Sequence, residues 1–195
     1  MSNDSNTASL LSRSLEEHLQ ALKTLLDSGL TDIEKSGRVI CDALAAGNKI
    51  LLCGNGGSAA DAQHIAAELV GRYEDERPAF PAIALTTDTS ALTAVSNDFG
   101  YEHVFARQVQ ALARPGDVLI AISTSGKSPN IIKAAETARD LGCTCIGLTG
   151  LHAEPLADYC FITVQVLSER TARVQEGHIT IGHLWCEMVD EILAK

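Results

Sequence analysis

The stretch that decides the fold runs from residue 50 to residue 64 and reads ILLCGNGGSAADAQH. Four apolar residues are followed by a glycine-rich turn and then by a segment with helical spacing. A short run that is apolar throughout predicts a strand buried on both faces, and glycines allow a tight turn into the next helix. The stretch therefore predicts a strand–loop–helix unit, with free backbone amides at the start of the helix.

The same alternation of strand and helix continues along the chain. Further strands are expected at residues 82–85, 118–122, 145–148 and 161–166. Helices are expected from the glycine turn to about residue 72, around 92–95, at 104–112 and 130–141, and from about Val174 to the end. Apolar strands that alternate with helices indicate an α/β fold with a parallel sheet covered on both faces, and ligands bind such sheets where strand order reverses.

Two helices are expected before the first strand. Leucines form one helical stripe, at Leu11, Leu15, Leu19, Leu22 and Leu26. Thr31 and Glu34 have the spacing of a capping box, and the second helix is expected to stop near Gly47. These helices can pack on the domain or on another subunit. Residues 1–9 are polar and expected to form a disordered leader, so residues 10–195 make up a single domain.

Composition narrows the range of functions. A net charge of −10 argues against nucleic-acid binding. The apolar runs are far shorter than the roughly 20 residues that span a bilayer, and the N-terminus lacks the pattern of a signal peptide. The six cysteines form no CxxC pair and fall mostly in apolar segments, which favours buried thiols over disulfides. The chain is therefore expected to be cytoplasmic, without membrane or nucleic-acid partners.

Two polar loops follow buried strands. The first loop, residues 54–59, fits the loose pattern GxGxx(G/A) of dinucleotide-binding proteins. Nicotinamide binding would also require an acidic residue about 20 positions farther on, and Asp88, the nearest candidate, lies too far along the chain. A tight turn without a ligand is the other alternative. The second, residues 123–128, ends like a nucleotide P-loop, yet Ala121 stands where its first glycine should be. Its four hydroxyls favour a phosphate monoester, with NTP hydrolysis and an incidental polar turn as alternatives.

Two helices carry groups that suit metal binding or proton transfer. His64 and Glu68 are four residues apart and share a face, although such a pair alone is commonly an ordinary surface pair. On the last helix, Gln175 and His183 are about 80° apart around the axis and can face one site, whereas His178 is offset. Glycines at 177 and 182 suggest that another backbone approaches closely. Two histidines, a carboxylate and an amide oxygen make zinc the leading candidate.

At these residues the sequence resembles the sedoheptulose 7-phosphate isomerases (phosphoheptose isomerases) of the sugar isomerase (SIS) domain superfamily. The resemblance covers nearly the whole chain after the leader. Its most specific pieces are Cys53–His64, Thr93–Gly100, Ile122–Gly126, and Val174–His178 with His183. The pattern departs after Leu148-Thr149-Gly150, where family members often carry a Gly-Gly pair, and this affects the shape of a loop rather than the named residues.

The resemblance implies a three-layer SIS sandwich with a five-stranded parallel sheet. It implies a homotetramer whose N-terminal helices serve oligomerisation and whose active sites lie between subunits. The implied reaction converts D-sedoheptulose 7-phosphate into D-glycero-D-manno-heptose 7-phosphate through an enediol, at the start of nucleotide-activated heptose biosynthesis, which can feed lipopolysaccharide.

The family's functional residues carry over onto matching positions. The implied substrate contacts are Asn55, Gly56, Gly57, Glu68, Asn97, Asp98, Ser123, Thr124, Ser125, Ser128 and Gln175. The implied zinc ligands are His64, Glu68, Gln175 and His183. Glu68 and His183 are also the implied acid/base pair, so the two assignments compete for the same side chains.

Two other classes share this type of fold. A sister SIS group binds the bacterial replication initiator without catalysis and lacks the carboxylate and histidine found here at Glu68 and His183. Sugar-phosphate-sensing regulators usually carry an added DNA-binding domain, which this sequence does not predict. The non-catalytic binding protein is therefore the alternative to the isomerase.

Overall fold

The computed structural model describes residues 2–193 of the chain. Its helices are α1 (Ser2–Ser28), α2 (Leu30–Ala45), α3 (Gly57–Val70), α4 (Thr89–Phe99), α5 (Val104–Leu112), α6 (Pro129–Asp140) and α7 (Thr171–Leu193), with short 3₁₀ turns η1 (Tyr101–His103) and η2 (Leu156–Tyr159). Its strands are β1 (Ile50–Cys53), β2 (Ala82–Ala84), β3 (Val118–Ile122), β4 (Thr144–Thr149) and β5 (Ile162–Gln165).

The five strands form one parallel sheet in the order β2-β1-β3-β4-β5. Residues of β1 pair with β2 on one side and with β3 on the other, so Leu52 lies between Ala84 and Ile120. The direction of winding therefore reverses between β1 and β3. This confirms the expected α/β fold and places the switch point at the two loops that follow these strands.

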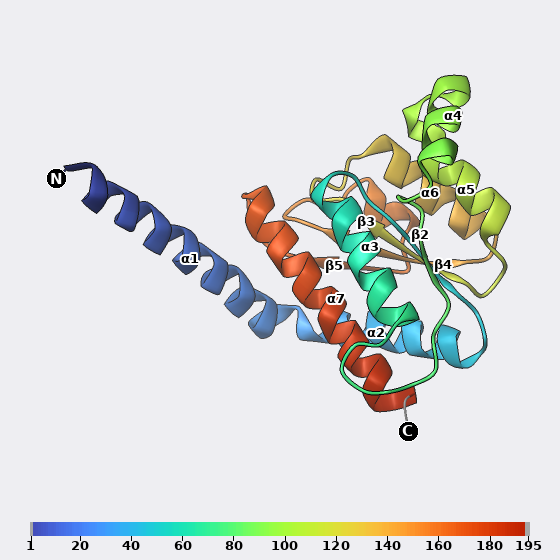
Figure 1. Ribbon diagram of the computed structural model, residues 1–195, viewed down its shortest axis with the longest axis horizontal. Helices are drawn as coiled ribbons and strands as arrows, with labels where there is room; N and C mark the ends of the chain where they lie inside the picture. Colours follow the sequence, from blue (N-terminus) through green and yellow to red (C-terminus); the bar gives the residue numbers. More distant parts are fainter. Residues whose placement is uncertain (1, 194–195) are drawn as a thin grey trace.

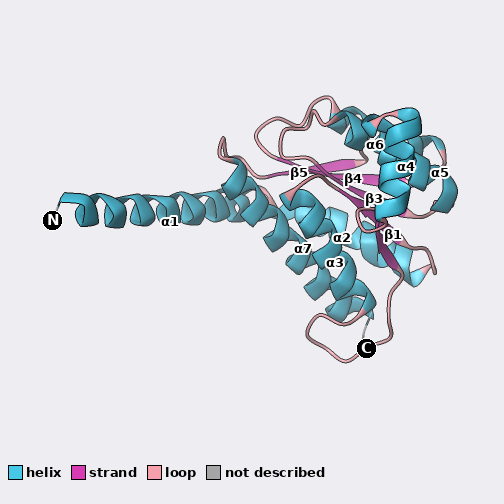
Figure 2. Ribbon diagram, turned by 45° about the horizontal axis from the view of Figure 1, so that its top comes forward, coloured by secondary structure: helices cyan, strands magenta, loops and turns pink. Residues whose placement is uncertain are grey.

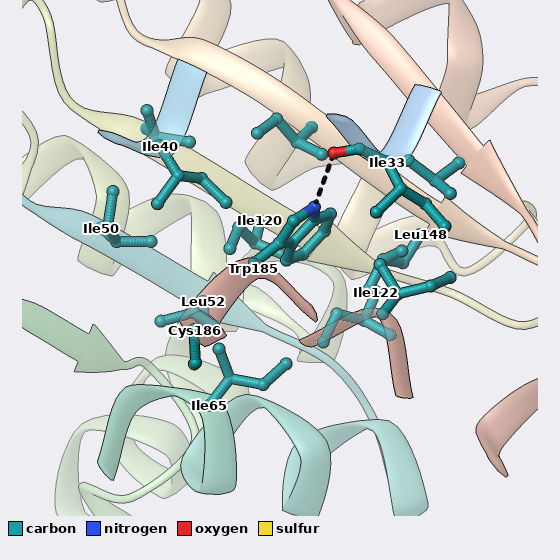
Figure 3. Packing of buried hydrophobic residues seen from close by; sticks show 14 of the residues in the cluster. Ile33, Ile40, Ile50, Leu52, Ile65, Ile120, Ile122, Leu148, Trp185 and Cys186 are labelled. Atoms are coloured by element: carbon teal, nitrogen blue, oxygen red, sulfur yellow. Dashed lines mark hydrogen bonds between the residues drawn. The ribbon is translucent and has the colours of Figure 1, made fainter. Parts of the chain in front are cut away.

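Helices cover both faces of the sheet (Figure 2). Helices α2, α3 and α7 pack on one face, where apolar side chains of the sheet meet the buried ring of Trp185. The indole nitrogen of Trp185 donates a hydrogen bond to the carbonyl of Ile33 at 3.3 Å, which ties α7 to α2 (Figure 3). Helices α5 and α6 cover the other face, around the buried Phe105. The core thus consists of two apolar layers, one on each face of the sheet.

Helix α7 lies very close to its neighbours at two glycines. A Cβ at Gly182 would lie 2.5 Å from Cδ1 of Ile65 on α3, and one at Gly177 would lie 2.6 Å from Cγ2 of Val166. The close approach expected at these glycines is present, but the approaching atoms belong to side chains and not to another backbone. It fixes the rotation of α7 against α3, and with it the direction in which the polar side chains of both helices point.

Helix α1 extends away from the rest of the chain, and only its C-terminal part approaches the sheet domain (Figures 1 and 2). Ala21 and Leu25 are buried there. A row of leucines along the helix is 50–65% exposed, at Leu10, Leu11, Leu15, Leu19 and Leu26. The helix includes residues 2–9, which differs from the expected disordered leader; no glycine or proline interrupts that segment.

Polar contacts join α1 to the first turns of α7. Arg173 donates to the backbone carbonyl of Ser14 and, at 3.0 Å, to its hydroxyl. Nδ1 of His18 lies 2.7 Å from Oε2 of Glu176, and Oε1 of the same carboxylate accepts from Arg173 at 2.6 Å. The start of α7 is therefore held in part by the N-terminal helix.

The expected capping box of α2 is wrong. The helix begins at Leu30 with Gly29 as its N-cap residue, and no side chain caps it. Thr31 is already inside the helix, because the Gly29 carbonyl accepts from Asp32 and Ile33. The expected end is confirmed, since α2 stops at Ala45, just before Gly47.

The segment between α3 and β2 is fixed by a buried ion pair. The Arg77 side chain is fully buried, and its Nε donates to Asp190 of α7 at 2.5 Å. Arg77 also donates to the carbonyl oxygens of Glu68 and Leu69 at 2.9 and 3.0 Å. The last turn of α3 is thereby secured beside α7. Within residues 2–193, no helix is both long and apolar enough to cross a membrane.

Candidate active site

The two polar loops meet at the switch point of the sheet. Asn55 follows β1, and Asn130 lies in the first turn of α6, which follows β3. Their side-chain amides exchange two hydrogen bonds of 2.8 and 2.9 Å, and the hydroxyl of Tyr101 donates to Asn55 at 3.1 Å. The loops are thus fixed against each other at the carboxyl ends of β1 and β3.

The second loop presents hydroxyls and the N-terminus of α6. Ser123 is buried, and its hydroxyl donates to that of Ser128 at 3.1 Å. Gly126 has a φ of 67°, and a Cβ there would meet the His152 carbonyl oxygen at 2.6 Å, so the turn requires glycine. Hydroxyls and helix amides in this arrangement suit the oxygens of a phosphate monoester.

A cavity of about 290 Å³ lies beside this loop. Thr124 and Ser125 line it together with residues of the segment after β4 and the start of α7, namely Leu151, His152, Ser168, Glu169, Thr171 and Val174. The hydroxyl loop therefore borders a space large enough for a small polar ligand.

The glycine loop brings α3 and α7 together at their N-terminal ends. A Cβ at Gly57 would lie 2.4 Å from Nε2 of Gln175, so the amide of Gln175 packs directly on the backbone of Gly57. Any larger residue at 57 would displace this amide. Gln175 and the first turn of α3 are therefore neighbours because position 57 has no side chain.

Farther along the same two helices, His64, Glu68 and His183 come together. Nε2 of His64 lies 3.1 Å from a carboxylate oxygen of Glu68 and 3.2 Å from Nε2 of His183. One ligand atom from each residue lies within 4.8 Å of the others. Glu68 is about one-quarter exposed and His64 about half exposed, so solvent and small molecules can reach the cluster.

The cluster has the chemistry and spacing of a metal site. Two imidazole nitrogens on one tetrahedral zinc, each bound at about 2.05 Å, lie about 3.3 Å apart. The nitrogens of His64 and His183 are 3.2 Å apart, and the Glu68 oxygen is equally close to His64. Three protein ligands with an open fourth position are typical of catalytic rather than structural zinc. The structure places the amide of Gln175, the other expected ligand, against Gly57, which lies about 10 Å along α3 from His64.

Two further side chains surround the cluster. Burial raises the pKa of Asp61, one turn before His64, to about 6, against the opposing effect of the nearby imidazole. The Oδ2 atom of Asp61 is buried, with no hydrogen-bond partner among the described residues. The ring of Tyr73 lies 5.5 Å from that of His183, centre to centre. The cluster is thus bordered by a half-buried acid and an aromatic ring.

Other expected residues lie apart from the cluster. Asn97 donates to Asp98 at 2.8 Å near the end of α4, which packs on α5 and η1 (Figure 1). His178 is buried, and its Nε2 lies 3.0 Å from the carbonyl oxygen of Thr149. Burial lowers its pKa to about 4. His178 is therefore a neutral core residue, as its offset position on the helix suggested.

Sequence reasoning missed three residues at this site. Asn130 and Tyr101 fix Asn55, and Tyr73 packs near His183. The position of Asn130 in the first turn after the hydroxyl loop was a usable signal, because that turn lies at the carboxyl edge of the sheet. Tyr73 and Tyr101 have no local pattern that marks them.

Comparisons with known proteins agree with the fold. Residues 15–150 match the SIS domain family model. A phosphoheptose isomerase from Solidesulfovibrio magneticus is 52% identical over 190 residues, covering 96% of this chain and 92% of the relative. The solved structure of a phosphoheptose isomerase from Neisseria gonorrhoeae is 40% identical with a TM-score of 0.90, covering 95% of this chain and all of the other. One from Francisella tularensis is 37% identical with a TM-score of 0.91, covering 95% of this chain and 98% of the other. The chain therefore belongs to the phosphoheptose isomerase family of SIS-domain proteins.

Proposed function

We propose that this protein is a sugar-phosphate isomerase that converts D-sedoheptulose 7-phosphate into D-glycero-D-manno-heptose 7-phosphate. One observation carries the proposal: His64 and Glu68 on α3, the helix that follows the glycine loop, converge with His183 of α7 within 4.8 Å. His64 lies about 10 Å along α3 from Gly57, and helical side chains lean back toward the N-terminus. A sugar chain that contacts the glycine loop can therefore extend along α3 to this cluster. The names of the family's relatives support the same substrate.

The chain's own residues would divide the work between binding and proton transfer. Ser123, Thr124, Ser125 and Ser128 would hold the phosphate together with the amides of α6. Asn55, Gly56, Gly57, Asn97, Asp98 and Gln175 would contact the sugar. These contacts would fix the position of the reacting carbons relative to α3 and α7.

The reaction itself requires one proton to move between two carbons. Glu68 would remove the proton from C1 of the ketose and return it to C2 of the aldose, through an enediol. His183 would move protons on the two oxygens. Both groups lie in one cluster, so one sugar end can contact both.

We infer that His64, Glu68 and His183 hold zinc, with Gln175 as a further ligand after a change of side-chain position. A bound zinc ion would polarise the substrate carbonyl and stabilise the charge that develops on its oxygen. The donor set and the nitrogen–nitrogen distance support this inference. The same three side chains are then both the metal site and the catalytic site.

We also infer that the protein is a homotetramer acting in the cytoplasm, with active sites between subunits. The exposed leucines of α1 support the association, because a monomer would leave this apolar row in water. A cavity of about 590 Å³ between α2 and α7, bordered by Ile33, Leu184 and Met188, offers a second apolar surface for a partner. The product would enter nucleotide-activated heptose synthesis, including that for lipopolysaccharide.

The test is isomerisation of sedoheptulose 7-phosphate in D₂O, followed by NMR, before and after treatment with a chelator. We expect aldose formation with deuterium at C2, and loss of the rate on chelation that zinc restores. Glu68→Gln should lower kcat at least about 10²-fold without lowering the melting temperature. The matched control Glu136→Gln removes an exposed carboxylate on α6 and should leave kcat unchanged. A folded protein without isomerisation or exchange would refute the proposal and favour the non-catalytic binding protein.

A further inference from the structure

A pair of cysteines lies outside the active site, at the opposite edge of the sheet. Cys145 is the second residue of β4, and Cys160 lies just before β5. Their sulfur atoms are 3.6 Å apart. The amide of Phe161 donates to the carbonyl of Cys145 at 2.8 Å, so the two backbones are already hydrogen-bonded neighbours. The pair is thus held in place by the parallel sheet.

The two sulfurs differ in access to solvent. Cys145 is 2% exposed, whereas Cys160 is partly exposed. Both line a cavity of about 290 Å³ near the end of α6, where Cys143 also contributes. Gly147 leaves room for the Cys160 sulfur, since a Cβ there would lie 3.1 Å from it. A small reagent can therefore reach Cys160, with Cys145 directly behind it.

The surroundings of the pair assign different roles to the two thiols. The hydrogen bond with Cys145 lowers the pKa of the Cys160 thiol, and one with the Thr163 hydroxyl lowers it further, against the opposing effect of burial. The pKa of Cys145 is raised, by the same hydrogen bond and by burial. Burial also raises the pKa of the other four thiols, those of Cys41, Cys53, Cys143 and Cys186. Among the described thiols, Cys160 is the one favoured as a thiolate.

We propose that Cys145 and Cys160 form a redox site that a hydroperoxide converts into a disulfide. The Cys160 thiolate attacks the outer oxygen of the hydroperoxide, the O–O bond breaks, and an alcohol or water leaves with a proton from solvent. The Cys145 sulfur then attacks the resulting sulfenic acid at Cys160, and the hydroxide that leaves takes the Cys145 proton as water. Two thiols are oxidised by two electrons, and one hydroperoxide is reduced. The sulfurs have to approach from 3.6 Å to a bond of about 2.0 Å.

The test uses the unaltered full-length protein treated with hydrogen peroxide under native conditions. Remaining thiols are alkylated, and peptides are mapped by mass spectrometry without reduction. We expect a cross-linked peptide pair joining Cys145 to Cys160, lighter by two hydrogen masses and reversed by dithiothreitol, with the other four cysteines alkylated after unfolding. Oxidation at another cysteine first, or sulfinic acid at Cys160 without a cross-link, would overturn the proposal.

Two variants separate the roles of the cysteines. Cys145→Ser should stop oxidation at the sulfenic acid of Cys160, which dimedone traps. Cys143→Ser, in the same cavity, should leave the cross-link unchanged and serves as the matched control. A cross-link that persists in Cys145→Ser would contradict the assignment. Because the main measurement uses the unaltered protein, a variant that fails to fold does not affect it.

Discussion

Lowering the pH from 7 to 4 should reduce the free energy of unfolding, and His178 should account for a measurable share of the loss. Its ring is buried, and burial lowers its pKa to about 4 in the folded protein, against an ordinary value of about 6.5. In the unfolded chain the imidazole takes up a proton as the pH falls through 6.5. The folded protein takes up that proton only near pH 4, so acid favours the unfolded state.

The size of the effect follows from the two pKa values. A difference of about 2.5 pH units, at 1.36 kcal/mol per unit, corresponds to roughly 3 kcal/mol. The contribution is fully present above pH 6.5, is lost at up to about 1.4 kcal/mol per pH unit below it, and levels off below pH 4. Asp61 acts in the opposite direction, because its raised pKa lets the folded protein bind a proton first. A single pH curve therefore contains both effects.

The variant His178→Gln isolates the histidine. Glutamine keeps a donor for the Thr149 carbonyl but does not titrate, and Asp61 contributes equally to both proteins. Urea unfolding at one fixed protein concentration, followed by the fluorescence of the single buried Trp185, gives the free energy at each pH. Between pH 7 and 4.5 the unaltered protein should lose about 2–3 kcal/mol more than the variant. Parallel curves for the two proteins would refute the burial of a neutral His178.

Two further changes test the site and the association of subunits. Gly57→Ala places a methyl group 2.4 Å from Nε2 of Gln175, so the amide should move while the fold survives. We expect kcat/KM to fall about 10- to 100-fold. Unchanged kinetics would show that Gln175 does not take part in the site. Leu15→Gln combined with Leu19→Gln makes two side chains polar that are each 65% exposed. If they contact another subunit, sedimentation velocity should show a smaller species than for the unaltered protein, because each buried leucine contributes about 1.5–3 kcal/mol. An unchanged sedimentation coefficient would contradict a role for this face in assembly.

Regular elements with a clear periodic pattern could be predicted closely. The expected bounds of α5 and β3 agree with the structure, because apolar runs and helical spacing decide such segments locally. The start of α2 could not be predicted in this way. Thr31 and Glu34 have the spacing of a capping box, but α2 begins at Leu30, directly after Gly29. A capping pattern predicts a helix start only where the preceding residues are not already helical.

In the site, too, features set by local spacing could be predicted, whereas features set by packing between helices could not. The spacing of His64 and Glu68 placed them on one face, and the 3.1 Å contact between them agrees. The contact of His183 with His64 depends on the packing of α7 against α3, which no local sequence pattern encodes. The available signals were a second pair of possible metal ligands on the last helix and the glycines within that helix. The position of Gln175 on Gly57 depends on side-chain packing and was not predicted. The catalytic and binding roles of these residues remain predictions.

The attachment of α1 to α7 gives residues near the start of the chain an influence on a distant part of it. A helix that stands away from the core relies on its few anchors, because isolated helices are only marginally stable in water. Fraying that reaches Ser14 or His18 would release Arg173 and Glu176, which lie two residues before and one residue after Gln175 on α7. A partner that holds α1 in place would therefore stabilise the first turns of α7. By thermodynamic reciprocity, a ligand that orders Gln175 would strengthen the binding of that partner to α1. The contacts of residues 14–18 with α7 thus couple the order of the N-terminal helix to the position of Gln175.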